Sequence, residues 1–494
     1  MVGAGNAGLA AAAITSRSGL KTLLLEKHNL PGGCASSFVR GRFEFETALH
    51  ELCFVGTEQH PNIIYKMFKD SGADIEWHYD VNLFRVILKG QDGFDVTVRA
   101  GRESFLDSIE EAVPGSRESV EALLQLADTN DDAINYVAQK SNKPSKLQMI
   151  FKHKNFLTSS SHTLSEIEKQ LGIPEKARNI IETYWCYLGV IPDELNAMHF
   201  LSMLRSYIDD GAAMPAMRSH ELTLALAESI RNNGGEVRYN SKVTHFITDN
   251  DRVIGVEVNG KPIYAKEIIS NIIPDTAYGM MDKDSVPKGD IKLLNARELA
   301  VSAYTIYLGL DLGADELGIK DYSVFVINDK NPKVQLEKHG LYIVNCLNKV
   351  IPDCSPKGTC MLFFTILDYG KNLPTGLKSE NYQKFKTDFA EKYIRDYEDL
   401  MSIDIMSHIE EIEVATPVTF ANYLSTPDGA IYGYRLSHWD NILSRILNSH
   451  TENSMPGLTF TGGHSTKGDG YSSAYSSGME VGKNIADRLK GTTR

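Results

Sequence analysis

The sequence lacks a hydrophobic run long enough to cross a membrane. Apolar runs such as Leu23-Leu24-Leu25 are far shorter than the roughly 20 residues that a membrane-spanning helix needs. The first residues also carry neither the positive stretch nor the apolar stretch of a signal peptide. We therefore expect no transmembrane segment and no signal peptide.

Positive charge is scarce. The chain has 51 Lys and Arg residues against 64 Asp and Glu residues, which gives a formal net charge of −13. Nucleic-acid-binding proteins need a basic surface that displaces counterions from phosphates. We therefore expect neither DNA nor RNA as a partner.

Cysteine is scarce as well. The six cysteines have neither the close paired spacing of a metal site nor the density of a disulfide framework. This pattern favours a reducing, cytoplasmic setting, and we expect no bound metal. The cysteines are Cys34, Cys53, Cys186, Cys346, Cys354 and Cys360.

A glycine loop stands at the start of the chain. In Gly3-x-Gly5-x-x-Gly8, the first glycine permits a tight turn, the second lets the backbone approach a diphosphate, and the third lets a helix pack on a strand. We expect this loop, with Asn6 and Ala7, to hold the diphosphate of a dinucleotide; a glycine-rich helix start that binds nothing is the alternative. Only two residues precede the loop, whereas a first strand normally has about five or six, so we expect a first strand that is cut short.

Two further features indicate which dinucleotide binds. Glu26 follows Gly3 by 23 residues, where a carboxylate can accept hydrogen bonds from both ribose hydroxyls, which favours FAD or NAD over NADP. The pair Gly32-Gly33, followed by Cys34, would let the backbone run close along an extended cofactor. Unless this pair is a plain Pro-Gly turn, the sequence favours FAD.

The chain of 494 residues is too long for one hydrophobic core, because cores stop growing near roughly 250–300 residues. We expect an α/β protein in which a Rossmann-type FAD-binding domain, like that of glutathione-reductase-like flavoproteins, is interleaved with an α+β substrate domain. The FAD-binding domain comprises residues 1–60, 216–275 and 441–494, and the substrate domain comprises residues 61–215 and 276–440. The expected helices are Leu9–Ser18, Glu221–Asn232 and Ser476–Leu489, and the expected strands are Thr22–Glu26, Glu236–Tyr239, Val243–Thr248, Val253–Val258, Ile263–Ser270, Tyr304–Leu310, Met361–Leu367 and Leu458–Thr461.

Several motifs in order along the chain resemble the superfamily of phytoene desaturases, carotenoid isomerases and retinol saturases. They are Leu25-Glu26-Lys27, Pro31-Gly32-Gly33, Phe43 to His50, Gly234-Gly235-Glu236-Val237, Ser270-Asn271-Ile272-Ile273-Pro274, Tyr307-Leu308-Gly309-Leu310, Ser355-Pro356-Lys357-Gly358 and Pro427 to Gly433. Within the superfamily, Cys34 replaces an arginine that is usual in desaturases and amine oxidases. His50 resembles the histidine of the retinol-saturase-like branch, so we favour that branch.

The resemblance implies further cofactor contacts. Val243 would contact adenine, and Lys27 belongs to the motif around the ribose acid. Gly463, with Gly462, and the run Ser477-Gly478-Met479 would lie along the diphosphate and near the flavin ring. Two elements depart from the family pattern: Glu46 and Ala48 replace the usual Asp and Gly, and Lys467-Gly468-Asp469-Gly470-Tyr471 replaces a Pro-Gly-x-Gly element.

Four polar side chains are candidates to deliver or remove a proton while the flavin moves a hydride. They are His50, Tyr432, His464 and Tyr471. For His50 the alternative is a hydrogen-bonded core histidine, and for Tyr432 it is a core role beside the turn at Gly429–Gly433.

A basic and apolar segment, Lys140–Leu157, suggests a possible peripheral contact with anionic lipid. Its lysines (Lys140, Lys143, Lys146, Lys152 and Lys154) alternate with apolar residues such as Leu147, Ile150 and Phe151. A solvated helix face is the alternative.

Together these features predict an FAD-dependent oxidoreductase. The expected reaction is saturation, desaturation or cis-trans isomerisation of a carbon–carbon double bond in a long apolar polyene, isoprenoid or fatty acyl substrate. An amine-oxidase-like enzyme and a flavin-bearing binding protein without turnover are the alternatives. The direction of the reaction, the oligomeric state, and whether NAD(P)H or a redox partner exchanges electrons with the flavin stay open.

Overall fold

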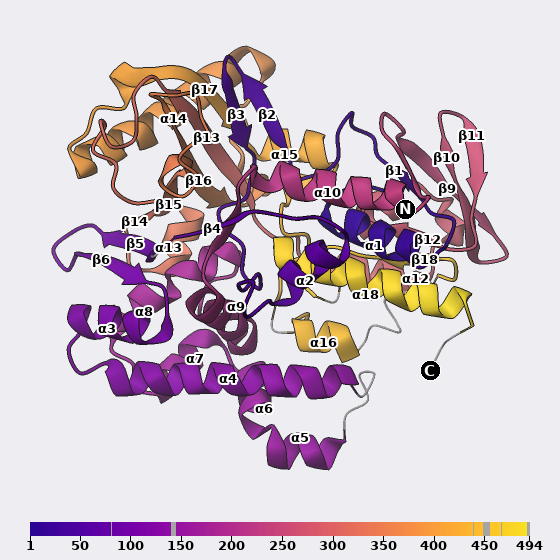
Figure 1. The fold of residues 1–494 in the computed structure, drawn as a ribbon, viewed down its shortest axis with the longest axis horizontal. Helices are drawn as coiled ribbons and strands as arrows, with labels where there is room; N and C mark the ends of the chain where they lie inside the picture. The colour runs from indigo at the N-terminus through magenta and orange to yellow at the C-terminus, as the bar shows by residue number, and fades with distance from the viewer. Residues whose placement is uncertain (81, 140–144, 438, 448–454, 466, 492–494) are drawn as a thin grey trace.

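The computed structural model describes residues 1–80, 82–139, 145–437, 439–447, 455–465 and 467–491 (Figure 1). A parallel sheet forms the centre of the nucleotide-binding half. Met1–Gly3 lie in its middle, because Val2 pairs in parallel with both Leu25 and Ser270. The strands on either side are β1 (Leu23–Leu25) with β8 (Glu236–Arg238), and β12 (Ile268–Ser270) with β18 (Leu458–Phe460).

Three helices pack beside this sheet. The small residues of α1 let it lie close against α18, which Figure 1 shows in yellow, and α10 packs against α1 as well. Added Cβ atoms at Gly478 and Gly482 would lie 2.2 Å and 2.9 Å from carbonyl oxygens of α1, so these glycines set the close approach. The three helices are α1 (Asn6–Arg17), α10 (Arg218–Asn232) and α18 (Tyr471–Leu489). Two shorter helices, α11 (Pro274–Tyr278) and α12 (Lys288–Ala296), follow β12 along the chain.

Two of the expected boundaries are wrong. The single strand expected over Ile263–Ser270 is two strands: β11 (Lys261–Tyr264) pairs with β10 (Arg252–Val258) in an antiparallel sheet completed by β9 (Val243–Asp249), whereas β12 lies in the parallel sheet. The chain must leave one sheet and enter the other, and this ends the strand at Tyr264. The last helix begins at Tyr471 rather than Ser476, and its close contacts with α1 lie further along, at Gly478 and Gly482.

A large mixed sheet forms the other half. Its order is β17-β13-β16-β15-β14-β5-β6, with only the β14–β5 pair parallel among the described strands. Tyr304, Ile306 and Leu308 of β13 face the helix α14, whereas Ala303 and Thr305 face the interior of the molecule, as a period of two requires. The elements are β5 (Asn82–Leu88), β6 (Phe94–Arg99), β13 (Ser302–Leu310), β14 (Ser323–Ile327), β15 (Leu341–Cys346), β16 (Cys360–Asp368), β17 (Ile409–Ala415), α13 (Pro332–Glu337) and α14 (Ser379–Met401).

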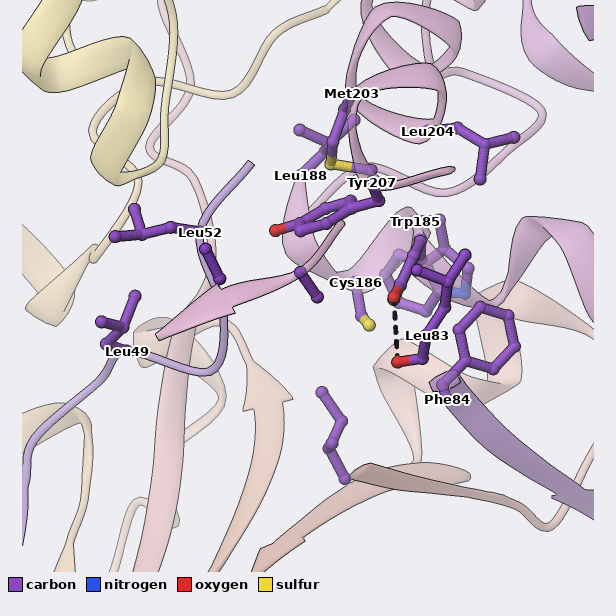
Figure 2. Packing of buried hydrophobic residues seen from close by; sticks show 14 of the residues in the cluster. Leu49, Leu52, Leu83, Phe84, Trp185, Cys186, Leu188, Met203, Leu204 and Tyr207 are labelled. Carbon is purple, nitrogen blue, oxygen red and sulfur yellow. Dashed lines mark hydrogen bonds between the residues drawn. The ribbon is translucent and has the colours of Figure 1, made fainter. Parts of the chain in front are cut away.

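A layer of helices covers the remaining side of the cavity described below. Figure 2 shows how Met203, Leu204 and Tyr207 of α9 pack with Trp185, Cys186 and Leu188 and with Leu83 and Phe84 of β5. The Tyr184 hydroxyl donates to the Leu83 carbonyl at 3.1 Å, which joins this layer to the mixed sheet. The helices are α3 (Arg102–Ala112), α4 (Arg117–Gln139), α5 (Lys146–Lys152), α6 (Lys154–Ser161), α7 (Leu164–Gln170), α8 (Glu175–Ile181), the 3-10 helix η1 (Glu182–Tyr187) and α9 (Ala197–Asp210).

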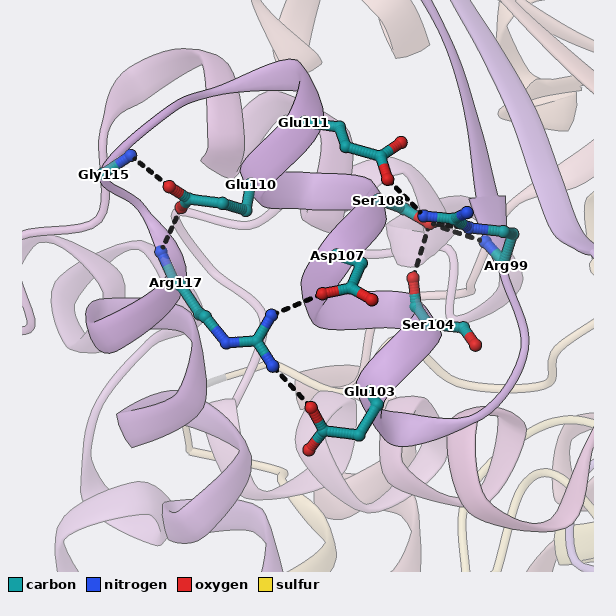
Figure 3. Close-up of polar contacts among 9 residues, drawn as sticks. All are labelled: Arg99, Glu103, Ser104, Asp107, Ser108, Glu110, Glu111, Gly115 and Arg117. Atoms are coloured by element: carbon teal, nitrogen blue, oxygen red, sulfur yellow. Dashed lines mark hydrogen bonds and ion pairs between the residues drawn. The ribbon is translucent and has the colours of Figure 1, made fainter.

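Polar contacts fix the corner between α3 and α4 (Figure 3). The Glu110 carboxylate accepts hydrogen bonds from the backbone N–H groups of Gly115 and Arg117, and these bonds hold its pKa below the usual range. The Arg117 guanidinium reaches back to Asp107 and Glu103 on α3. The long helix α4 thereby starts in a defined direction; α6 packs against it, and α5 lies below α6 at the bottom of Figure 1.

Shorter elements connect these layers. They are β2 (Ser37–Arg40), β3 (Phe43–Glu46), α2 (Ile63–Asp70), β4 (Trp77–Tyr79), β7 (Ala213–Pro215), α15 (Pro417–Leu424) and α16 (Ile442–Leu447). Among the described residues, no helix is long and apolar enough to cross a membrane.

Candidate functional site

A cavity of about 600 Å³ lies between the two sheets. One end is lined by residues that follow the strands of the parallel sheet: Gly3, Glu26, Asn271 and Gly462. Ligands of such sheets bind outside the carboxyl ends of the strands, where the loops diverge. The other end is lined by the mixed sheet through Ala303, Thr305, Thr365 and Leu367.

The glycine loop lines the first end, and its close contacts require glycine. Gly3 has a φ of +90°, and a Cβ on Gly8 would lie 2.1 Å from the Gly3 carbonyl oxygen. Gly5 is the N-cap of α1 and provides no capping side chain. The first N–H groups of a helix have no acceptor within it, so this helix start, lined by Gly5, Asn6 and Ala7, can receive an anion.

The sequence analysis named Asn271 only within a family motif and assigned it no contact, although it follows a buried strand directly. Its Oδ1 accepts from the Gly8 N–H at 3.3 Å, and its Nδ2 donates to the Thr461 carbonyl at 3.0 Å. It therefore joins the glycine loop to the loop after β18. A polar residue at the carboxyl end of a parallel strand is the signal that could have identified it.

The second glycine segment lies against the first. The Gly32 N–H donates to the Ala4 carbonyl at 2.8 Å, and Gly5 and Gly32 pair in parallel. Gly32 and Gly33 both have positive φ, and both line the cavity with Cys34. Burial raises the pKa of the Cys34 thiol to about 12, so this cysteine is not a thiolate nucleophile.

Glu26 lies beside the glycine loop and is buried, with 7% of its surface exposed. Its Oε2 accepts from the Ala4 N–H at 2.7 Å, and its Oε1 accepts from the His28 N–H at 2.9 Å. A carboxylate has about four lone-pair directions, so two remain for a ligand. Lys27 and Val243 line the same end, and Lys27 Nζ donates to Ser425 Oγ at 2.5 Å.

These residues fit an extended dinucleotide such as FAD. The loops approach where a Cβ would clash, the start of α1 has no side-chain cap, and the Glu26 carboxylate keeps free lone pairs. In addition, the buried Asn6 Oδ1 faces this end without a hydrogen-bond partner among the described residues. A dinucleotide diphosphate with its ribose meets this set of donors and acceptors.

Three residues expected at the cofactor do not line the cavity, because α18 starts earlier than predicted. Ser477 is buried and bonds to Thr461 and Ser465, Gly478 packs on α1, and Met479 packs against the hydrophobic core. The start of α18, from Gly470 through Ala474, lines the cavity instead. Gly463 lines it as expected.

His50 lines the cavity, but protein groups occupy both of its ring nitrogens. Nδ1 lies 2.7 Å from Asn345 Oδ1, and Nε2 lies 3.2 Å from the Thr365 hydroxyl. Burial lowers its pKa to about 4, so the ring is neutral at physiological pH. The geometry is that of a hydrogen-bonded histidine in a cavity wall, the alternative that the sequence left open.

The other three candidates also line the cavity. Tyr471 donates to the Cys34 carbonyl at 2.8 Å, and the Tyr432 hydroxyl lies 3.5 Å from the Cys186 carbonyl. Burial raises the pKa of both tyrosines well above the usual value. His464 Nε2 is buried without a hydrogen-bond partner in the described part of the chain, and burial lowers the His464 pKa to about 3.

Two buried carboxyl groups that the sequence did not single out line the same cavity. Neither Glu51 nor Asp469 has a hydrogen-bond partner for its carboxyl oxygens among the described residues. Burial raises the pKa of Glu51 to about 8 and that of Asp469 to about 7. The sequence places Glu51 next to His50, and it places Asp469 within Lys467–Tyr471, the element that differs from the family pattern. The sequence does not show that either carboxyl group is buried.

A further surface lies outside the cavity on α5. Leu147, Ile150 and Phe151 are exposed to 68%, 54% and 82%. On the inner face of the same helix, Met149 packs with Phe156 and Met198, which line the cavity. Lys152 and Lys154 are exposed next to this apolar face; Lys140 and Lys143 lie outside the described residues.

The fold and this cavity are those of a Rossmann-type dinucleotide-binding protein. Residues 1–70 match the family described as an NAD(P)-binding Rossmann-like domain. Among solved structures, an oxidoreductase from Methanosarcina mazei matches with a TM-score of 0.66 and 14% identity over 98% of this chain and 99% of that one. Cyclohexylamine oxidase from Brevibacterium oxydans matches with a TM-score of 0.64 and 14% identity over 99% and 98%.

Relatives identified by sequence indicate which enzymes of this fold the chain resembles. The chain is 24% identical to all-trans-retinol 13,14-reductase of Danio rerio, over 88% of this chain and 77% of the relative. It is 24% identical to the chloroplastic prolycopene isomerase of Daucus carota, over 88% and 71%. It is also 24% identical to a 4,4'-diapophytoene desaturase of a Methylomonas species, over 99% and 95%. These matches confirm the prediction of an FAD-dependent oxidoreductase in the phytoene desaturase, carotenoid isomerase and retinol saturase superfamily.

Proposed function

We propose that this protein adds, removes or relocates hydrogen at a carbon–carbon double bond of a long apolar substrate. The observation that carries the proposal is the continuity of the cavity, which joins the dinucleotide end to an apolar wall. The relatives act, by name, on retinol, prolycopene and diapophytoene, which are polyenes or isoprenoids. The wall residues that would contact such a chain are Ile134, Phe156, Leu188, Met198, Met203 and Ile442.

We assign the cofactor contacts as follows. The loop with Gly3, Gly5, Asn6 and Ala7 holds the diphosphate of FAD at the start of α1, where the helix dipole stabilises negative charge. Glu26 accepts from the ribose hydroxyls. Bound FAD supplies a ring that accepts or donates a hydride. Other residues that line this part of the cavity are Lys27, Gly32, Gly33, Cys34, Val243 and Gly463.

The chain's own residues position the substrate and exclude water. Apolar burial holds a polyene without any charged anchor, at about 25 cal/mol per Å² of apolar surface removed from water. His50, neutral and held by Asn345 and Thr365, shapes the wall rather than delivering a proton. Its place as a catalytic base is therefore less favoured than that of the two buried carboxyl groups.

Amine oxidation is the competing function, because amine oxidases share the fold and because Glu51 and Asp469 line the cavity. A cationic amine requires an ionised carboxylate as partner. The raised pKa values of both carboxyl groups oppose ionisation. An uncharged substrate fits the cavity better.

The test uses the full chain reconstituted with FAD under anaerobic conditions. We expect all-trans-retinol to reoxidise the chemically reduced flavin and gain two hydrogen atoms, or 4,4'-diapophytoene to bleach the oxidised flavin, or prolycopene to isomerise. Cyclohexylamine serves as the amine probe. Bleaching by cyclohexylamine alone would replace the proposal with amine oxidation, and a flavin that responds to none of the probes would indicate a binding protein.

We also propose that α5 rests on an anionic lipid surface and so brings an apolar substrate to the cavity. The outer face of the helix is apolar, and its inner face contacts cavity-lining residues. Residues 146–161 contain three lysines (Lys146, Lys152 and Lys154) and no acidic residue, in a chain of net charge −13. Each lysine near a membrane contributes on the order of 1 kcal/mol, and salt screens it.

Co-sedimentation with vesicles tests this contact. We expect binding to phosphatidylserine-containing vesicles that weakens with salt and is lost when Ile150 and Phe151 are replaced by Ser. The control is Leu224→Ser, which removes an apolar side chain that is 45% exposed on α10. Equal binding of wild type to neutral and anionic vesicles, or to neither, would favour a solvated helix face.

A further inference from the structure

Asp469 and His199 face each other across the cavity wall, one from each half of the protein. Asp469 belongs to the loop that precedes α18 and is 4% exposed, and His199 belongs to α9 and is 9% exposed. His199 Nε2 lies 3.9 Å from Asp469 Oδ1. The other ring nitrogen of His199 and both carboxyl oxygens of Asp469 have no hydrogen-bond partner among the described residues.

Buried polar atoms are nearly always hydrogen-bonded, because an unpaired one costs free energy. Two such atoms on the Asp469 carboxyl group, with a third on the His199 ring that faces it, therefore indicate that this pair meets a ligand or exchanges a proton. Asp469 is also close to the cofactor end, since a Cβ on Gly463 would lie 3.5 Å from its Cα. His199 shares α9 with Met198 and Met203, which line the apolar end.

We propose that Asp469, paired with His199, carries the proton that accompanies hydride transfer in this cavity. The inference rests on the proposed double-bond chemistry and assigns its acid and base. Saturation needs one hydride and one proton. The hydride and its two electrons come from reduced FAD, which becomes oxidised. The proton comes from the Asp469 carboxyl group, whose O–H bond breaks as a C–H bond forms, leaving a carboxylate. Desaturation is the reverse.

The surroundings suit both protonation states. Burial raises the pKa of Asp469 to about 7, although the nearby Arg445 guanidinium opposes this shift. A donor or acceptor works best with a pKa near the working pH. The charged and titratable groups that face Asp469 are His199 on α9, Arg445 on α16 and Tyr432. Burial lowers the pKa of His199 to about 4, so this ring is neutral and can move towards the carboxylate as a hydrogen-bond donor.

The first test reads the proton directly and does not depend on turnover. Infrared difference spectra of the FAD-loaded protein, titrated from about pH 5 to about pH 9, should show a carboxylic-acid carbonyl band that disappears near neutral pH. The comparison is made in the Glu51→Gln background, because Glu51 also loses its proton within this pH range. In that background the band should remain, should be absent when Asp469→Asn is added, and should shift its midpoint when His199→Gln is added. A band that keeps its amplitude and midpoint in Glu51→Gln/Asp469→Asn would overturn the inference.

The second test follows flavin absorbance after anaerobic mixing with all-trans-retinol. Asp469→Asn should slow the reaction by at least about a hundredfold, the usual contribution of a general acid or base, while FAD content and melting temperature stay close to wild type. Asp469→Glu should recover part of the rate with an altered pH profile. If wild type reacts and Asp469→Asn reacts equally fast, the inference is wrong and the proposed function stands. If wild type itself does not react with any polyene probe, the proposed function fails, and the infrared titration alone decides whether Asp469 exchanges a proton.

Discussion

Replacing Glu26 by Gln changes one oxygen of a carboxylate to an amide nitrogen at nearly constant shape. In the structure, each carboxylate oxygen already accepts one backbone N–H, from Ala4 and from His28. Glutamine has only one acceptor oxygen, so one of these N–H groups must face an NH₂ group. The substitution therefore acts on the protein without cofactor as well as on FAD binding.

The size of both effects follows from the geometry. A hydrogen bond to a charged acceptor contributes about 1.5–3 kcal/mol, and leaving a buried donor unpaired costs about 1–3 kcal/mol. We expect Glu26→Gln to lower the free energy of unfolding of the cofactor-free protein by about 1–3 kcal/mol. If Glu26 also accepts from the ribose hydroxyls, the Kd for FAD should rise by about tenfold to a hundredfold, because about 1.4 kcal/mol corresponds to a factor of ten.

Urea unfolding and calorimetric titration of the cofactor-free protein with FAD measure the two effects separately. Glu236→Gln is the matched control, since Glu236 lies on the neighbouring strand β8 with an exposed side chain paired to Arg238. The control should change neither quantity by more than about 0.5 kcal/mol. Lowered stability with unchanged FAD affinity would refute the assignment of Glu26 to the ribose.

Three further predictions concern the cavity and the helix pair behind it. The folded state keeps the Glu51 proton up to about pH 8, whereas the unfolded chain loses it above about 4.5. The Glu51 contribution to the free energy of unfolding therefore falls by about 1.4 kcal/mol per pH unit within this window and levels off above it. Urea unfolding should show this slope reduced in Glu51→Gln and retained in Glu228→Gln, an exposed control on α10. His50→Gln should lower the free energy of unfolding by about 1–3 kcal/mol, because it disturbs the buried partners of His50. The pH profile of flavin reduction between about pH 5 and 8 should keep its shape. If the variant loses a titration step from this profile, His50 is the proton carrier. Gly478→Ala should lower the melting temperature and FAD content, because its Cβ would meet an α1 carbonyl at 2.2 Å, whereas Gly289→Ala, a helical glycine with nothing within 4 Å, should be neutral or slightly stabilising; equal effects would contradict the packing argument.

The sequence by itself determined the features that depend on local geometry. The spacing of Gly3, Gly5 and Gly8 and the position of Glu26 follow from one strand, one turn and one helix, which a short segment specifies on its own. The strands expected at Tyr304–Leu310 and Met361–Leu367 are confirmed as β13 and β16, because a long apolar run of that length and composition fits a buried strand. The glycine loop and Glu26 predicted the Rossmann fold, the pair Gly32-Gly33 favoured FAD, and the motifs in order along the chain indicated the superfamily.

Only the tertiary structure decided what depends on distant partners. The close packing of α18 on α1 joins segments that lie far apart in the sequence, and Ile263–Ser270 divides because its two ends join different sheets. His50 is held by Asn345 and Thr365, roughly 300 residues away in sequence. The raised pKa of Asp469 arises from burial in the cavity wall. Burial is set by every element that surrounds a group, so no local pattern in the sequence reports it.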